Sequence, residues 1–172
     1  MDLDKAIGLV AEVPDFPRPG ILFRDFAPLF ASADGFAAVT AALADTLDHD
    51  VELLAAVEAR GFLLAAALGQ ASGLGVVMVR KPGKLPQVAA RADYELEYGT
   101  AALELPAGVV QPGQHVAVID DVLATGGTVA AACGLLEQAD AVVTGVSVVL
   151  ELDGLGGREA LSGRQVHALH SS

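Results

Sequence analysis

Val116-Ala-Val-Ile-Asp-Asp-Val-Leu-Ala-Thr-Gly-Gly-Thr128 is the stretch that decides the fold class of this 172-residue chain. The apolar run from Val116 to Ile119 has the continuous hydrophobicity of a parallel strand buried on both faces. Two acids, Asp120 and Asp121, follow it. We therefore expect both at the carboxyl end of the strand, where open α/β sheets bind their ligands. The stretch as a whole predicts strand, loop and helix in an α/β fold.

The residues after the acids suit an anion. They are small, so their backbone N–H groups and hydroxyls can close on a phosphate, and the following helix adds the positive end of its dipole. Neither a P-loop lysine nor Gly-x-Gly-x-x-Gly is present. Acids ahead of the glycines favour a phosphorylated ribose, because carboxylates accept hydrogen bonds from ribose hydroxyls; the competing interpretation is an ordinary strand-to-helix turn. The residues of this predicted cradle are Ala124, Thr125, Gly126, Gly127 and Thr128.

This stretch, from Ile119 to Thr128, resembles the phosphoribosyl-pyrophosphate loop of type I phosphoribosyltransferases, and its Ala-Thr-Gly-Gly-Thr form is most similar to the adenine-specific members. The resemblance extends from Phe16 to Leu161. It implies one domain over residues 1–172, with a central, mainly parallel sheet flanked by helices. It further implies a small hood over the base, about 13–30 and 151–172, and a flexible catalytic loop, about 81–99.

A second strand-to-helix turn follows the apolar run Leu53 to Val57. A cation at a helix start is disfavoured by the helix dipole unless an anion is also there, so Arg60 indicates an anion site. The resemblance implies that Ala59, Arg60 and Gly61 bind the pyrophosphate of the donor. It also implies a cis peptide bond between Glu58 and Ala59.

Four of the ten basic residues fall between Arg80 and Arg91, which in an acidic chain indicates a local anion site; the alternative is a solvated charged loop. From Arg80 to Tyr98 the chain has no convincing period and is expected to be a long mobile loop. The resemblance implies that Glu97 is the acid/base group near the purine and that Tyr98 closes the site. It places Arg80, Lys81 and Lys84 on pyrophosphate, partly across the interface of a homodimer.

The segment from Ile21 to Pro28 carries two phenylalanines among aliphatic residues, and on periodicity alone it could be a packed edge. The resemblance implies instead that it begins the hood. Leu22 then lends backbone hydrogen bonds to the edge of adenine, Phe23 stacks on the ring and Arg24 lies beside the base. Stacking of a base on an aromatic ring contributes on the order of 1–3 kcal/mol.

Composition limits the remaining classes. A net charge of −12 argues against a nucleic-acid partner, because phosphate backbones are bound by clustered Lys and Arg. Residues 61–79 carry no charge, but glycines and polar residues interrupt the run, so no membrane span is expected. The N-terminus lacks a signal peptide and Cys133 is the single cysteine, expected as a buried hydrophobe, which together predict a cytoplasmic protein.

The histidines show no zinc-binding pattern, and His167 and His170 are expected in a solvated tail. Mg²⁺ is expected as a cofactor bound through the phosphates of the donor, near Asp120 and Asp121, with no ligand required from the protein. The other expected elements are helices over Asp4 to Glu12, Asp34 to Leu47 (with Asp34 as N-cap) and Phe62 to Gln70, and strands over Gly75 to Val79, Thr100 to Leu105 and Ala141 to Leu150.

The resemblance implies transfer of ribose 5-phosphate from phosphoribosyl pyrophosphate to adenine, which yields AMP and pyrophosphate in purine salvage. Two alternatives stay open at this point. A 6-oxopurine phosphoribosyltransferase would share the donor loop, although not the hood or the Glu97-Tyr98 pair. A regulator that binds the donor without catalysis would need a nucleic-acid-binding element, and the ~30 residues before the first long helix are too few and too acidic for a helix-turn-helix module.

Overall fold

A computed structural model describes residues 1–95 and 100–172, and the chain divides into two compact units, Met1–Ala42 and Leu43–Ser172. The first unit contains α1 (Leu3–Ile7), β1 (Ala11–Pro14), β2 (Leu22–Asp25), α2 (Ala27–Ala31) and most of α3 (Ala33–Ala44). The second contains β3 (Leu53–Val57), α4 (Arg60–Ser72), β4 (Gly75–Val79), β5 (Val88–Glu95), β6 (Thr100–Pro106), β7 (His115–Leu123), α5 (Gly127–Gln138), β8 (Val142–Glu151), α6 (Gly157–Ala160) and β9 (Val166–Ser171).

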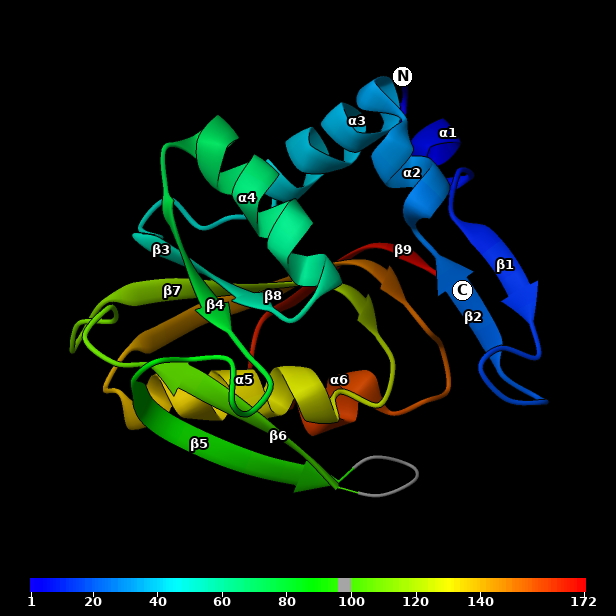
Figure 1. The fold of residues 1–172 in the computed structure, drawn as a ribbon. Coiled ribbons are helices and arrows are strands. Elements are labelled where there is room, and N and C mark those ends of the chain that lie inside the picture. Colours follow the sequence, from blue (N-terminus) through cyan, green and yellow to red (C-terminus); the bar gives the residue numbers. More distant parts are fainter. Residues whose placement is uncertain (96–99) are drawn as a thin grey trace. The chain divides into compact units, whose positions relative to one another are not determined.

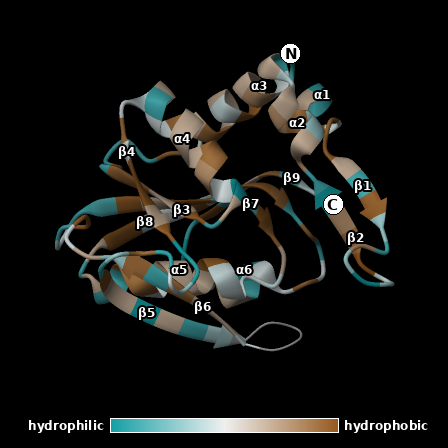
Figure 2. Cartoon of the chain, in the orientation of Figure 1, coloured by the Kyte–Doolittle hydropathy of each residue, from teal (hydrophilic) through white to brown (hydrophobic). Residues whose placement is uncertain are grey.

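The second unit is built on a five-stranded sheet with the order β4-β3-β7-β8-β9, in which every neighbouring pair is parallel. Helix α4 covers one face, and α5 with the β5–β6 hairpin covers the other (Figure 1). Strands covered on both faces need apolar side chains on both, and Figure 2 shows the sheet as mainly hydrophobic. The expected central, mainly parallel sheet flanked by helices is confirmed.

The predicted end of the central strand at Ile119 was wrong. Strand β7 continues to Leu123, because its backbone pairing with β8 runs on past the acids, with Asp120 opposite Val148. Backbone hydrogen bonds do not depend on side-chain polarity, so the end of the apolar run did not mark the end of the strand. Pairing with β3 stops at Ile119, so the acids lie in the part of β7 that extends beyond β3.

The expectation of a long irregular loop after Arg80 was also wrong in part. Residues Val88–Glu95 form β5, which pairs antiparallel with β6. Its inward side chains, Ala90, Ala92 and Tyr94, pack against the core under α5. Two of these three are only methyl groups, so the alternation was too weak in hydrophobicity to reveal the strand. Glu97 and Tyr98 lie outside the described residues, and their predicted roles stay predictions.

Two local predictions needed correction. Helix α1 ends at Ile7, and Ala11 and Glu12, expected at the end of that helix, instead begin the strand β1. Helix α3 begins at Ala33, and the Oγ of Ser32, not the carboxylate of Asp34, accepts the N–H of Gly35 at 3.1 Å. The C-terminal tail forms β9, in which His170 is exposed and His167 is partly buried. Strands β3 and β4 have the predicted bounds.

The first unit has a small core of its own, with Ala6, Phe26, Leu29 and Val39 fully buried. Strands β1 and β2 pair antiparallel, and the Phe16–Pro17 peptide bond between them is cis. None of the described helices is both long and apolar enough to span a bilayer. The thiol of Cys133 is fully buried, as expected, and burial raises its pKa to about 11.

Candidate active site

Asp120, Asp121 and Arg60 lie close together. Arg60 follows β3 as the first residue of α4, and the two acids lie near the carboxyl end of β7. Both acids are buried, and the Nε of Arg60 lies 2.6 Å from the Oδ2 of Asp121. The backbone N–H of Asp121 donates to the Oδ1 of Asp120 at 2.9 Å. Burial, followed by the neighbouring Asp121 charge, raises the pKa of Asp120 well above its ordinary value. Among the described ion pairs, the Arg60 guanidinium contacts Asp121, so a ligand that offers hydrogen-bond donors or a cation would suit this buried pair of acids.

Gly61 lets the turn after β3 approach β7 closely. A Cβ atom on Gly61 would lie 2.9 Å from the backbone oxygen of Ile119 and 3.2 Å from the Oδ1 of Asp120, so a larger residue does not fit without a shift. The Glu58–Ala59 peptide bond is cis, as the resemblance implied. Ala59 is the N-cap of α4 and has no side-chain cap of its own. The turn therefore presents Ala59 and Arg60 beside the acids of β7.

The predicted phosphate cradle lies between β7 and α5. Gly126 adopts a φ of 81°, a left-handed conformation that favours glycine, and α5 begins at Gly127 with no side-chain N-cap. The first N–H groups of a helix have no acceptor within it, so a start without a capping side chain suits an anion. The exposed Thr125 completes the loop. This local geometry is what the sequence predicted for Ala124 to Thr128.

The cradle is backed by the backbone of the C-terminal segment. A Cβ atom on Gly126 would lie 2.7 Å from the backbone oxygen of Gly157, and one on Gly157 would lie 2.5 Å from that of Ala124. Each of the two glycines therefore allows one backbone to rest directly on the other. The shape of the loop is set by this contact as well as by its own sequence.

Thr128 forms a side-chain hydrogen bond with a residue of β5, the strand that precedes the undescribed residues. Its Oγ1 donates a hydrogen bond to the phenol oxygen of Tyr94 at 3.3 Å. Thr128 is in the first turn of α5 and Tyr94 is near the end of β5. The phosphate cradle is thereby linked to the strand that leads toward Glu97.

The basic segment from Arg80 to Lys84 follows β4. The Nε of Arg80 lies 3.4 Å from the Oε2 of Glu58, and its Cζ lies 5.7 Å from the centre of the Phe62 ring. The Lys81 and Lys84 side chains are exposed, and neither forms an ion pair with an acidic side chain described in residues 1–94 or 100–172. Arg80 is thus held against the protein, whereas the two lysines extend into solvent.

Two acids contact this basic segment. Glu58 accepts the backbone N–H of Lys81 at 2.9 Å, and Glu104 accepts that of Gly83 at 3.2 Å. Burial alone would raise the pKa of Glu58, but the Lys81 N–H and the charge of Arg80 outweigh burial and lower it. Glu104 is itself 7% exposed, on a strand whose neighbouring residues are also buried.

The predicted base-binding residues Leu22, Phe23 and Arg24 follow one another on β2 in the first unit. The ring of Phe23 packs edge-on against that of Phe16 with centroids 5.1 Å apart. Arg24 forms an ion pair with Glu12, its partner across the β1–β2 ladder. The aromatic pair and the exposed Leu22 give this hairpin an apolar surface suited to a flat ring.

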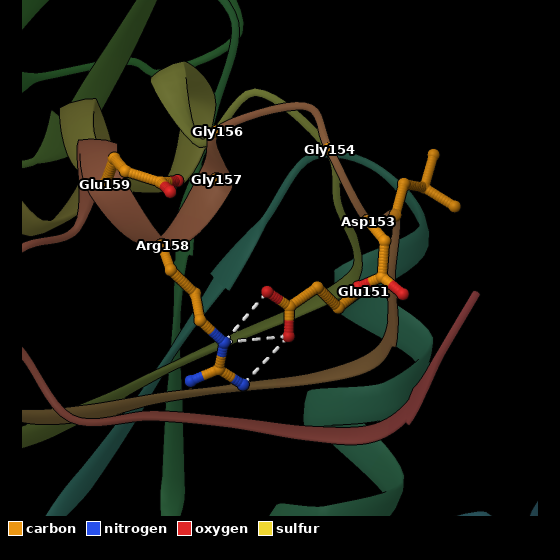
Figure 3. Close-up of a pocket in the computed structure, with 8 residues that line it drawn as sticks. Glu151, Asp153, Gly154, Gly156, Gly157, Arg158 and Glu159 are labelled. Atoms are coloured by element: carbon orange, nitrogen blue, oxygen red, sulfur yellow. Dashed lines mark hydrogen bonds and ion pairs between the residues drawn. The ribbon is translucent and has the colours of Figure 1, made fainter.

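A polar pocket of about 320 Å³ lies between β8 and α6. Figure 3 shows Arg158 and Glu151 across it, with the Nε of Arg158 2.8 and 2.9 Å from the two carboxylate oxygens. Arg158 also donates to the backbone oxygen of Val166 at 3.1 Å. This bidentate pair closes the C-terminal segment onto β9 and holds Gly157 behind the phosphate cradle.

The second unit brings together two of the predicted groups, the acids of β7 and Arg60, and it sets the cradle directly after those acids. The sequence analysis missed three contributors: Tyr94, Glu104 and Gly157. A carboxylate between two inward-facing leucines, as in Leu103-Glu104-Leu105, is a signal that could have identified the second of these. The other two depend on contacts between distant segments and left no local pattern.

Known proteins are similar to this chain over nearly its full length. An adenine phosphoribosyltransferase of Saccharopolyspora erythraea is 58% identical over 168 residues, which are 98% of this chain and 91% of that protein. The crystal structure of adenine phosphoribosyltransferase from Thermoanaerobacter pseudethanolicus superposes with a TM-score of 0.95 at 42% identity, covering 99% of both chains.

The Saccharomyces cerevisiae enzyme, complexed with adenine and an imino-altritol bisphosphate, gives a TM-score of 0.90 at 36% identity, covering 97% of both chains. A comparison with models of protein families found no match. The chain belongs to the adenine phosphoribosyltransferases, the pentosyltransferases of purine salvage that form AMP and pyrophosphate from adenine and phosphoribosyl pyrophosphate.

Proposed function

We propose that the edge of the sheet formed by β3 and β7 binds the phosphoribosyl donor. Asp120 and Asp121 accept hydrogen bonds from its ribose hydroxyls, and the cradle from Ala124 to Thr128 binds its 5-phosphate. The observation that carries this assignment is the buried acid pair with Arg60 against Asp121, directly ahead of the uncapped start of α5. Ribose hydroxyls would supply further hydrogen-bond donors to these carboxylates.

The pyrophosphate of the donor is assigned to Ala59, Arg60 and Gly61, with Lys81 and Lys84 added from the basic segment. The two lysines are exposed and the N–H groups of the α4 start are close to Arg60, so both are available to an anion. Arg80 acts differently in this proposal. Its contacts with Glu58 and Phe62 support a role in shaping the segment while contributing its charge to the leaving group.

The base is assigned to Leu22, Phe23 and Arg24 on the apolar β1–β2 hairpin, and the yeast enzyme, which is similar to this chain, binds adenine. Glu97 and Tyr98, which lie outside the described residues, remain proposed as the acid/base group and its neighbour. Cleavage at the anomeric carbon develops oxocarbenium character, so the protein needs to orient base and sugar and to stabilise the leaving pyrophosphate. No protein nucleophile is required.

Mg²⁺ is proposed as a cofactor held mainly by the donor's phosphates. The residues fit it, because the two buried carboxyl groups of β7 provide the oxygen ligands that Mg²⁺ prefers. In this proposal, Asp120 and Asp121 lie on the side of the ribose that is nearer the Mg²⁺ ion. When bound, the ion supplies charge neutralisation at the leaving pyrophosphate.

A homodimer in the cytoplasm completes the proposal. Leu63 on α4 and Val76 and Met78 on the edge strand β4 are exposed by 51%, 37% and 45%, so these two elements carry apolar surface that a partner subunit would cover. A stable dimer buries about 1,200–2,000 Å² in total, and this surface could form its centre. Sedimentation velocity of the wild type and of Met78→Glu tests it, with a dimer and a monomer expected; a monomeric wild type would contradict the dimer.

The site assignment is tested by steady-state phosphoribosyl transfer with Mg²⁺. Adenine, hypoxanthine, guanine and xanthine are compared, each with the wild type and with Glu97→Ala. AMP formation from adenine alone, with a large loss in the variant, is expected. Turnover of a 6-oxopurine would show that the base assignment to β2 is wrong, and an unchanged rate in Glu97→Ala would remove that residue from the mechanism.

A further inference from the structure

Two acids from other strands contact the basic segment that is proposed to bind pyrophosphate, which is the opposite of what charge alone favours. Glu58 and Glu104 both contact the chain between Arg80 and Lys84. A carboxylate near an anion site repels the anion, so its presence there calls for another function. Their contacts indicate what that function is.

Glu58 reaches the segment from the end of β3. Its Oε2 accepts the backbone N–H of Lys81 at 2.9 Å and lies 3.4 Å from the Nε of Arg80. Its own backbone N–H donates to the oxygen of Val79 at 3.1 Å, which fixes where the acid stands relative to β4. One carboxylate thus holds both the main chain and a side chain at the start of the segment.

Glu104 reaches the same segment from β6. Its Oε2 accepts the backbone N–H of Gly83 at 3.2 Å, while its backbone N–H and oxygen both pair with Arg80, at 2.7 and 3.0 Å. Gly83 has a φ of 78°, a turn conformation in which the chain reverses before Lys84. The second carboxylate therefore holds the turn that carries the second lysine.

We propose that Glu58 and Glu104 are positioning residues that together fix the backbone of residues 80–84, so that the side chains of Lys81 and Lys84 project toward the donor's pyrophosphate. Lys81 donates its own backbone N–H to Glu58, and Lys84 directly follows Gly83, whose N–H is bound by Glu104. The two carboxylates contact backbone N–H groups, Arg80 and, at 4.0 Å from Glu104, Arg91, whereas neither lysine forms an ion pair within the described residues. This inference rests on the proposed pyrophosphate role of the two lysines.

The test uses variants that separate the loss of the hydrogen-bond acceptor from the loss of the negative charge. Glu58→Gln and Glu104→Gln keep a side-chain oxygen that can accept the N–H, whereas Glu58→Ala and Glu104→Ala remove it. Glu52→Ala is the matched control, because Glu52 also accepts a backbone N–H, that of His115 at 2.9 Å, at the opposite ends of the strands. Initial rates give kcat and KM for the donor and for adenine, and melting temperatures show whether each variant is folded.

Both alanine variants are expected to raise KM for phosphoribosyl pyrophosphate about tenfold, because each loses a hydrogen bond to a charged acceptor. Their kcat and their KM for adenine are expected to stay within about twofold of the wild-type values. Both glutamine variants and Glu52→Ala are expected to keep the wild-type KM for the donor. Glutamine variants as impaired as the alanine ones, or alanine variants with tighter donor binding, would overturn the proposal, because charge and not placement would then be decisive. If an alanine variant does not fold, Glu58→Asp and Glu104→Asp, which draw the acceptor oxygen back toward the main chain, replace it, and an unchanged KM for the donor in both then overturns the proposal.

Lys81→Ala and Lys84→Ala separate this inference from the role it rests on. A raised KM for the donor in these variants supports the pyrophosphate role. If the lysine variants raise KM while Glu104→Ala does not, the positioning inference alone is wrong. If neither lysine variant changes KM, the pyrophosphate role fails first.

Discussion

The Nε of Arg60 lies 2.6 Å from the Oδ2 of Asp121, which joins the end of β3 to the extended end of β7. Asp121 is buried, whereas the Arg60 side chain is 38% exposed. The pair therefore connects a group proposed to bind pyrophosphate with one proposed to bind ribose. A ligand that contacts both groups would be placed by a single ion pair.

Arg60→Ala is expected to lower kcat/KM for the donor by about 10²-fold or more, because it removes a preorganised cation at the leaving group and leaves two acids adjacent without a counter-charge. Steady-state kinetics with varied donor concentration measure the effect. Arg164→Ala serves as the control, since that arginine pairs with Glu137 at 2.8 Å on the surface near the end of α5. Equal losses in both variants would mean that Arg60 has no special role.

Asp120→Asn is expected to stabilise the ligand-free protein at neutral pH while weakening donor binding. The pKa of Asp120 is raised in the folded state, so the charged form destabilises the fold; its favourable contribution is present below the unfolded pKa and is lost as pH rises through the folded pKa. Melting temperatures of both proteins between pH 4 and 8 should therefore diverge as pH increases. A lower melting temperature for the variant at neutral pH would contradict this.

Tyr94→Phe is expected to raise KM for the donor by about two- to tenfold, because it removes the acceptor of the Thr128 hydroxyl and with it about 0.5–1.5 kcal/mol of hydrogen bonding. The ring remains in the core, so the melting temperature should change little. Initial rates and thermal unfolding of the same preparation distinguish the two effects. A large loss of stability with an unchanged KM would assign Tyr94 to packing alone.

Gly61→Ala is expected to destabilise the protein by about 1–3 kcal/mol, since the added methyl group would lie 2.9 Å from the oxygen of Ile119. For a domain of this size the melting temperature falls by about 2–4 °C per kcal/mol. Gly134→Ala on α5 is the control, because its added Cβ would meet no described atom within 4 Å apart from its own stretch of helix, and alanine favours a helix. If Gly61→Ala melts as Gly134→Ala does, the close approach is not required.

The parts of the fold that a short apolar run defines could be predicted from the sequence. Strands β3 and β4 are such runs, β3 between Glu52 and Glu58 and β4 between a glycine-containing turn and Arg80, and their limits were correct. Strand β5 was missed because Ala90 and Ala92 contribute little hydrophobicity to its inward face. The end of β7 was missed because its last residues are held by backbone pairing with β8, which side chains do not report.

The candidate site was likewise predictable where its residues are adjacent in the sequence and not where they come from distant segments. The cradle and the acids are contiguous in sequence, so their chemistry could be inferred from neighbours. The contact of Arg60 with Asp121 requires β3 and β7 to lie side by side in a given register, and no local pattern specifies that register. The acceptance of the Gly83 N–H by Glu104 likewise joins residues that are 21 positions apart.

The mutual contact of Gly126 and Gly157 has a consequence for inheritance and for engineering. Because each glycine leaves room for the main chain of the other segment, neither can acquire a side chain unless the other segment moves away. The loop after β7 and the segment from Gly156 to Leu161 must then vary together among descendants of this chain. A donor loop transplanted into another scaffold would keep its shape only if that terminal segment were transplanted with it.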